Sequence, residues 1–180
     1  MPSLHPGYRK KWYYGAAGLY DSVVTANFNR YKLFFQLFFI PTQITITRIG
    51  IEVINPGWSE TESVARLGIY SNNNREAVPE NLILDAGEVL IGTSGFKELI
   101  ISQTLLPGWY WTAAIGNHYA ALRGVNYSEF DHFLLGNIGP NNNGYYSYID
   151  YEYGNLPNNI NQPDIIYHEY RPPFIHVRRV

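Results

Sequence analysis

Turn-forming residues interrupt this chain so often that no long helix fits between them. Clusters rich in Asn, Gly and Pro occur at 55–57, 71–74, 92–95, 107–108 and 139–144. Short runs of β-branched and aromatic residues lie between them, a spacing typical of sandwiches and barrels. The pattern predicts an all-β fold, an antiparallel β-sandwich that is jelly-roll-like, with at most one or two helical turns at 128–135.

The length of the chain, 180 residues, suits one domain with a single core. There is no cysteine, so no disulfide can form and stability has to come from packing. Residues 1–30 combine Gly, Tyr and basic residues with little alternation, which predicts an extended N-terminal attachment arm. Residues 31–180 then form the sandwich domain. Because the sequence starts at Met1, we expect a complete gene product.

Two runs of residues make specific predictions about strands. The apolar run 33–40 is too short for a membrane helix, which needs about twenty residues, and predicts a strand buried on both faces. In 44–53 the apolar residues change parity midway along the run. A β-bulge near Thr47 or Arg48 would restore one apolar face, and so would a strand that crosses between sheets.

Later strands follow from simpler alternation. Apolar residues at 65, 67 and 69 share one face, which leaves Arg66 on the other face to pair outward or hold a loop. The odd residues from Trp109 to Ile115 form an apolar face, so this strand is expected to cross the centre of the core. Further strands are expected at 96–101, 165–170 and 174–180, the last one closing a sheet edge.

Several function classes find no support in the sequence. The net charge is −2 and no basic stripe is present, so nucleic acid is not an expected partner. No signal peptide or membrane-inserting segment is visible. Nucleophile elbows, phosphate-binding loops and zinc-protease motifs are absent, and the five histidines lack metal-binding spacing. We therefore expect no enzyme, no metal and no cofactor.

Aromatic residues offer the best candidates for contact, because the chain has 16 Tyr and 4 Trp. Trp58, in a predicted turn, is either a contact anchor or a lid over the end of the sandwich. In the strand expected at 145–153, the odd face is predicted to join the core. The even face would offer rings and carboxylates to a glycan or protein partner, or would simply be solvated. Its residues are Tyr146, Tyr148, Asp150 and Glu152.

The same even face allows a catalytic alternative. Asp150 and Glu152 would lie about 6–7 Å apart on a strand, near the spacing of glycosidase carboxylates. Any Asp-x-Glu in a strand gives this spacing, so the signal is weak. In the N-terminal arm, aromatic side chains could become ordered on a partner. These are Tyr8, Trp12, Tyr13, Tyr14 and Tyr20.

The stretches 47–53, 65–72, 84–89 and 101–111 together resemble a β-sandwich module of tailed-bacteriophage virion proteins, found in tail fibres and capsid surface proteins. The resemblance runs from about Phe39 to the C-terminus and carries no catalytic residue. It implies a virion structural protein, made in the bacterial host cytoplasm. The expected role is capsid decoration or cement protein, or short fibre or adaptor subunit.

The resemblance also implies partners. Other virion proteins, capsid or tail subunits, would be contacted at the virion surface, and a homo-oligomer is expected, with a trimer favoured. The alternative function is a receptor- or glycan-binding module of a tail fibre, which would contact a host surface glycan.

Overall fold

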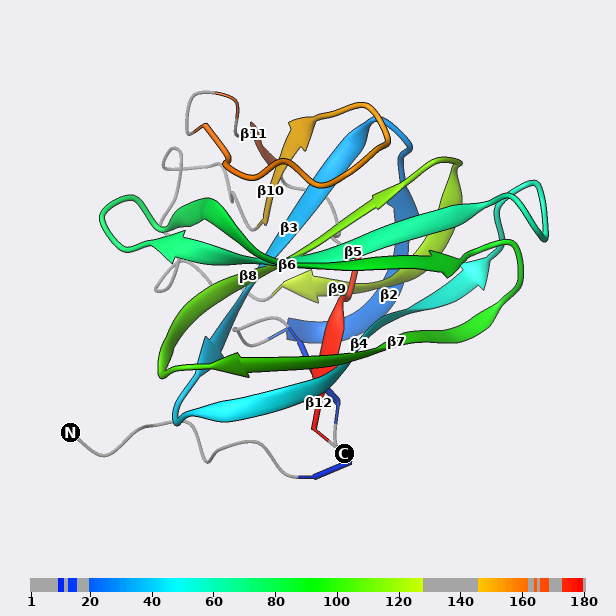
Figure 1. The fold of residues 1–180 in the computed structure, drawn as a ribbon. Helices are drawn as coiled ribbons and strands as arrows, with labels where there is room; N and C mark the ends of the chain where they lie inside the picture. Colours follow the sequence, from blue (N-terminus) through cyan, green and yellow to red (C-terminus); the bar gives the residue numbers. More distant parts are fainter. Residues whose placement is uncertain are drawn as a thin grey trace.

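The computed structural model describes residues 10–11, 13–15, 20–127, 146–161, 164, 166–168 and 173–179. These residues form two antiparallel sheets that pack face to face (Figure 1). The predicted all-β sandwich is therefore confirmed. The helical turns expected at 128–135 lie outside the described residues.

Eight consecutive strands, β2 to β9, are divided between the two sheets in a jelly-roll order: neighbours in sequence lie in opposite sheets, except β5 and β6, which pair with each other. Sheet A contains, side by side, β2 (Tyr20–Phe28), β9 (Ala120–Tyr127), β4 (Ile44–Asn55) and β7 (Gly95–Leu105). Sheet B contains β3 (Lys32–Ile40), β8 (Gly108–Gly116), β5 (Val64–Asn73) and β6 (Val78–Leu90). This arrangement brings loops that are distant in sequence to the same end of the sandwich.

Four short strands extend the sheets. In sheet A, β12 (His176–Arg178) pairs with β4, and β1 (Tyr13–Tyr14) pairs with β12. In sheet B, β10 (Tyr146–Asp150) pairs with β3, and β11 (Ile166–His168) pairs with β10. Strands are thus found within both C-terminal segments where the sequence predicts them.

The change of parity of the apolar residues in 44–53 coincides with an irregularity in strand pairing. The register between β4 and β7 shifts between Ile46 and Arg48, at the predicted place. Ile46 and Ile49 are both buried in the core despite their odd spacing. Because both belong to the cluster between the sheets, the strand stays in one sheet and does not cross over.

Sheet B is covered on both of its faces. The main core lies between the sheets, and a second apolar cluster packs on the outer face of sheet B beneath residues 151–160, here called the strap. The run predicted to be doubly buried follows this plan: Phe34 joins the main core and Phe35 joins the second cluster. Trp111 also belongs to the second cluster, so the expectation that it centres the main core is wrong.

Part of the segment predicted as an arm belongs to the sandwich. Residues 20–28 form β2, which pairs along its length with β9, and Ala26 and Phe28 are 1% and 0% exposed. Apolar and polar residues alternate only in part of 20–28, so the sequence alone does not identify this segment as a strand. Its pairing with β9 does. Tyr14 is half-buried against the main core. Tyr8, Trp12 and the side chains of Tyr13 and Tyr20 lie outside the described part of the chain.

Candidate contact site at the loop end of the sandwich

Exposed aromatic side chains gather on three loops at one end of the sandwich. The loops are the β2–β3 turn, the β4–β5 loop and the β8–β9 loop, which lie on the right in Figure 1. We call this group the aromatic end; it consists of Arg30, Tyr31, Trp58, His118 and Tyr119.

Asn117 fastens the β8–β9 loop to the neighbouring chain. Its side-chain oxygen accepts a hydrogen bond from the backbone N–H of Val64 at 2.8 Å, and its amide nitrogen donates to the carbonyl of Glu62 at 2.7 Å. The same oxygen lies 3.0 Å from Nδ1 of His118. One side chain therefore fixes His118 and Tyr119 against the loop that carries Trp58.

The β4–β5 loop is tied by its own serines. The N–H of Ser59 donates to Oγ of Ser63, and the N–H of Ser63 donates to the carbonyl of Ser59. Gly57 fits closely here, because a Cβ at this position would lie 2.6 Å from Oγ of Ser63. Its N–H donates to the carbonyl of Ile91 at 2.9 Å. Trp58 is thus carried by a hydrogen-bonded loop with little room to rearrange.

The rings of the aromatic end remain open to solvent. Trp58 is 77% exposed, so it does not fold back as a lid, and its ring meets His118 edge-on with centroids 5.6 Å apart. The Arg30 guanidinium lies 4.4 Å from the ring centroid of Tyr31 and 5.9 Å from that of Tyr119. Aromatic rings held beside an arginine form a surface suited to contact with a partner.

The predicted tyrosine–carboxylate face does not form as expected. Tyr148 is only 7% exposed and packs with Phe34 in the main core, so the expectation that it is exposed is wrong. The physical reason is that sheet B has an apolar cover on both sides, so Tyr148 and Ile149, which point to opposite faces of β10, are both buried. The side chain of Tyr146 lies outside the described residues.

The carboxylates of this segment lie at the strand end. Asp150, 72% exposed, pairs with Nζ of Lys32 at 3.3 Å, and the Lys32 ammonium also lies 3.5 Å from the ring centroid of Tyr148. β10 ends at Asp150, so the alternation that would place Glu152 on the same face does not continue to it. The N–H of Tyr151 donates to the carbonyl of Tyr31, which places this segment next to the aromatic end.

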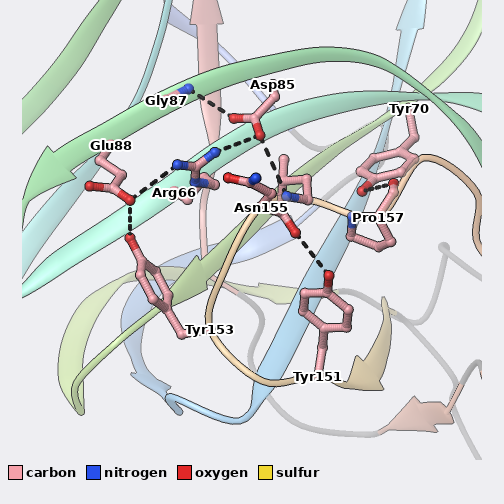
Figure 2. A network of polar contacts seen from close by, with 10 residues as sticks. Arg66, Tyr70, Asp85, Gly87, Glu88, Tyr151, Tyr153, Asn155 and Pro157 are labelled. Atoms are coloured by element: carbon pink, nitrogen blue, oxygen red, sulfur yellow. Dashed lines mark hydrogen bonds and ion pairs between the residues drawn. The ribbon is translucent and has the colours of Figure 1, made fainter.

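A second polar cluster holds the strap, as Figure 2 shows. Arg66 donates to Asp85 at 2.7 Å and to Glu88 at 3.2 Å. Tyr153 donates from its hydroxyl to the same Glu88 oxygen at 2.6 Å, and the N–H of Leu156 donates to Asp85 at 3.4 Å. Arg66 therefore holds a loop, one of the two roles that the alternation of β5 allows.

The surroundings of Arg66 and Tyr153 raise the pKa of both groups. Burial works against the charge of Arg66, but hydrogen bonds and attraction from Asp85 and Glu88 outweigh it and raise the Arg66 pKa. Burial, followed by the hydrogen bond to Glu88, raises the pKa of Tyr153. Both shifts favour the protonated form of the two donors.

His176 forms the centre of a third cluster, on the outer face of sheet A. It is 1% exposed, lies beside Phe96 and is 3.3 Å from Glu98, which also accepts two hydrogen bonds from Arg178 at 2.8 Å. Burial lowers the His176 pKa, although Glu98 opposes the shift. Burial alone would raise the pKa of Glu98, but the Arg178 hydrogen bond and charge lower it overall.

Within the described ranges, no three His, Asp or Glu side chains are grouped so as to hold a metal ion. In that same part of the chain, no helix is long and apolar enough to cross a membrane. Comparison with known proteins gave neither a matching family model nor a significant match among curated proteins.

Sequence reasoning identified Trp58 and missed its neighbours. Tyr31 and the adjacent pair His118 and Tyr119 lie far from Trp58 in the chain, and no local pattern distinguishes them from other aromatic residues. The only signal was an asparagine in each of two turns, Asn29 and Asn117. That these turns meet at one end follows only from the jelly-roll order of the strands.

Proposed function

We propose that this protein is a non-catalytic structural protein at the surface of a tailed-phage virion, a capsid decoration protein or a short fibre or adaptor subunit, which contacts a neighbouring virion protein through the aromatic end. The observation that carries the contact site is Trp58, 77% exposed and packed edge-on against His118 on hydrogen-bonded loops. The virion setting is supported by the sequence resemblance from Phe39 onward. Jelly rolls occur in capsid proteins, but also in lectins and cupins, so the fold is compatible with this setting without assigning it.

The composition of the aromatic end suits a protein contact. Trp, Tyr and Arg are the residues that most often dominate binding energy at interfaces, and truncation of a central one typically costs about 2 kcal/mol or more. That loss corresponds to a roughly 30-fold weaker affinity. Because the loops are already fixed by Asn117 and the serines, little ordering entropy is lost when a partner binds.

The test uses phage particles released by the organism that carries the gene. Purified particles are analysed by quantitative mass spectrometry, and we expect this chain in a fixed copy number. In particles assembled with Trp58→Ala/Tyr119→Ala, we expect the chain to be lost, while the purified variant keeps wild-type stability because both rings are exposed.

Leu106→Ala is the matched control. Leu106 is 61% exposed and precedes β8, at the opposite end of that strand from His118 and Tyr119. We expect it to be incorporated normally. Absence of the wild-type chain from the particles would refute the virion function, whereas normal incorporation of the double variant would refute the contact site.

A second candidate is the receptor- or glycan-binding function, favoured by the open ring faces of Trp58 and Tyr119. Sugar rings pack on exposed aromatic platforms, and Arg30 and Asp150 nearby provide hydrogen-bonding groups. In this case the double variant is incorporated into particles but no longer adsorbs to host cells. A glycan array probed with wild-type protein should then give a signal that the double variant lacks.

A further inference from the structure

The edges of the two sheets are protected to very different degrees. In sheet B, β10 covers the edge of β3, and the strap covers part of the edge of β6 through hydrogen bonds from Leu82 N–H to Asn158 and from Ile160 N–H to Glu80. In sheet A, no strand among the described residues pairs with the outer edge of β2 or of β7. Unpaired edges are surfaces on which another strand can add.

The two open edges of sheet A differ in polarity. The outward residues of β2 that are described, Thr25 and Asn27, are polar and exposed. On β7, Ile100 is 79% exposed in the middle of an 11-residue strand. The one charged residue on the outward face of β7 is Glu98, which is neutralised by Arg178 at 2.8 Å. A long strand of this kind combines an apolar centre with no uncompensated outward charge.

We propose that β7 pairs antiparallel with β7 of a second copy of this chain, about a two-fold axis at Ile100, to form a homodimer with a continuous sheet. Ile100 is the midpoint of Gly95–Leu105, so this register pairs the strand over its full length. The most exposed residue of β7 then meets its own copy at the axis and is withdrawn from water.

The charges of β7 are compatible with this register and disfavour two neighbouring ones. With the axis at Ile100, Glu98 lies opposite Ser102 of the second copy, and Lys97 lies opposite Gln103. An axis at Lys97 or Glu98 would place two like charges opposite each other, which is unfavourable. The register shift against β4 lies near the centre of β7. On both sides of it, even-numbered residues are exposed and odd-numbered residues are less so; the exception is Glu98, which is half-buried beside Arg178. The alternation keeps Ile100 on the outward face, where it can meet its copy.

This inference goes beyond the proposed function and does not depend on it. The phage resemblance favours a trimer, whereas isologous edge pairing closes after two copies. The mass of the oligomer in solution therefore distinguishes the dimer proposed here from the trimer that the resemblance favours. A partner protein bound at the aromatic end would leave the centre of the β7 edge available, because Ile100 lies five residues from Gly95, the end of β7 that pairs next to the β4–β5 loop.

The first experiment measures mass by size-exclusion chromatography with light scattering. We expect wild-type protein to run at twice the 20.7 kDa of a single chain and to dissociate on dilution. Ile100→Lys places two ammonium groups at the axis and should give a monomer. Thr25→Lys, at an exposed position on the other open edge, should remain a dimer. Circular dichroism of each variant shows whether it is folded.

The second experiment tests the register. The chain has no cysteine, so each single-cysteine variant carries one thiol. Residues directly opposite on antiparallel strands have Cβ atoms about 4.5–5.5 Å apart, close to what a disulfide requires. We expect Ile100→Cys to form a cross-linked dimer under mild oxidation, and Thr104→Cys and Thr25→Cys not to do so.

A monomeric wild type at the highest soluble concentration would overturn the proposal, and so would a trimer. A dimer that Ile100→Lys leaves intact would also overturn it, because the two copies would then meet elsewhere. Cross-linking through Thr104→Cys in place of Ile100→Cys would contradict the register.

Discussion

Replacing Arg66 by methionine removes the guanidinium that joins β5 to the strap through Asp85 and Glu88. Methionine keeps most of the apolar stem, so the change isolates the polar contacts. The Arg66 and Asp85 side chains are 20% and 25% exposed and their atoms lie 2.7 Å apart, whereas Glu88 is 41% exposed. The Arg66–Asp85 pair is therefore intermediate between surface and buried ion pairs.

The expected loss of stability follows from this intermediate burial of the ion pair. Exposed ion pairs contribute about 0.2–1 kcal/mol, and breaking a buried pair costs about 3–5 kcal/mol. We take about 2 kcal/mol for Arg66→Met, because Nε of Arg66 is buried without an acceptor among the described residues and its removal offsets part of the loss. For a chain of this length that lowers Tm by about 4–8 °C.

The assay combines urea unfolding with hydrogen exchange. The N–H groups of Leu82 and Ile160 bond across to Asn158 and Glu80, so they report whether the strap is closed. If Arg66 holds the strap, these amides should exchange about 30-fold faster in the variant, the equivalent of about 2 kcal/mol.

Arg75→Met removes an exposed arginine in the β5–β6 turn and serves as the control, with an expected change within about 0.5 kcal/mol. If Arg66→Met matched this control in stability and in amide exchange, the reasoning that the ion pairs hold the strap would be refuted.

Two further predictions concern buried side chains. Tyr148→Ala should lower the free energy of unfolding in urea by about 3 kcal/mol, because the ring packs with Phe34 in the main core; a change below about 1 kcal/mol would contradict that placement. Burial lowers the His176 pKa below its ordinary 6.5, so the folded state holds the neutral ring while the unfolded state takes up a proton. Stability should therefore be full above pH 6.5 and fall as the pH drops towards the folded pKa, by about 1.4 kcal/mol for each pH unit that separates the unfolded pKa from the folded pKa. His176→Gln should lack this slope in urea titrations, and the lowered pKa of Glu98, beside Arg178, should add a further loss below pH 4.5 in both proteins.

Alternation and turn residues were enough to predict much of the fold. The doubly buried strand β3, the irregularity near Arg48 and the outward position of Arg66 are all local consequences of a period of two residues. Turn clusters set the number and length of the strands. The all-β class and the sandwich can therefore be predicted from local sequence patterns.

Alternation also has a clear limit, because it says which side chains share a face and not what covers that face. Alternation therefore gives the wrong surroundings for Tyr148, which lies in the main core and not at the surface, and for Trp111, which lies in the second cluster and not in the main core. The reason is that sheet B is covered by sheet A on one face and by the strap on the other. The weak alternation in residues 20–28 predicts an extended arm, and only their pairing with β9 makes them a strand.

The sequence by itself determined that Trp58 would lie in a turn, with strands of an all-β sandwich around it. Only the tertiary structure decided that His118 would pack against it and that Tyr31 and Tyr119 would lie at the same end of the sandwich. The reason is that the jelly-roll order places most successive strands in opposite sheets, which brings the β2–β3, β4–β5 and β8–β9 loops to one end although they are far apart in the sequence. Neighbours of that kind are set by strand order, which no local pattern encodes.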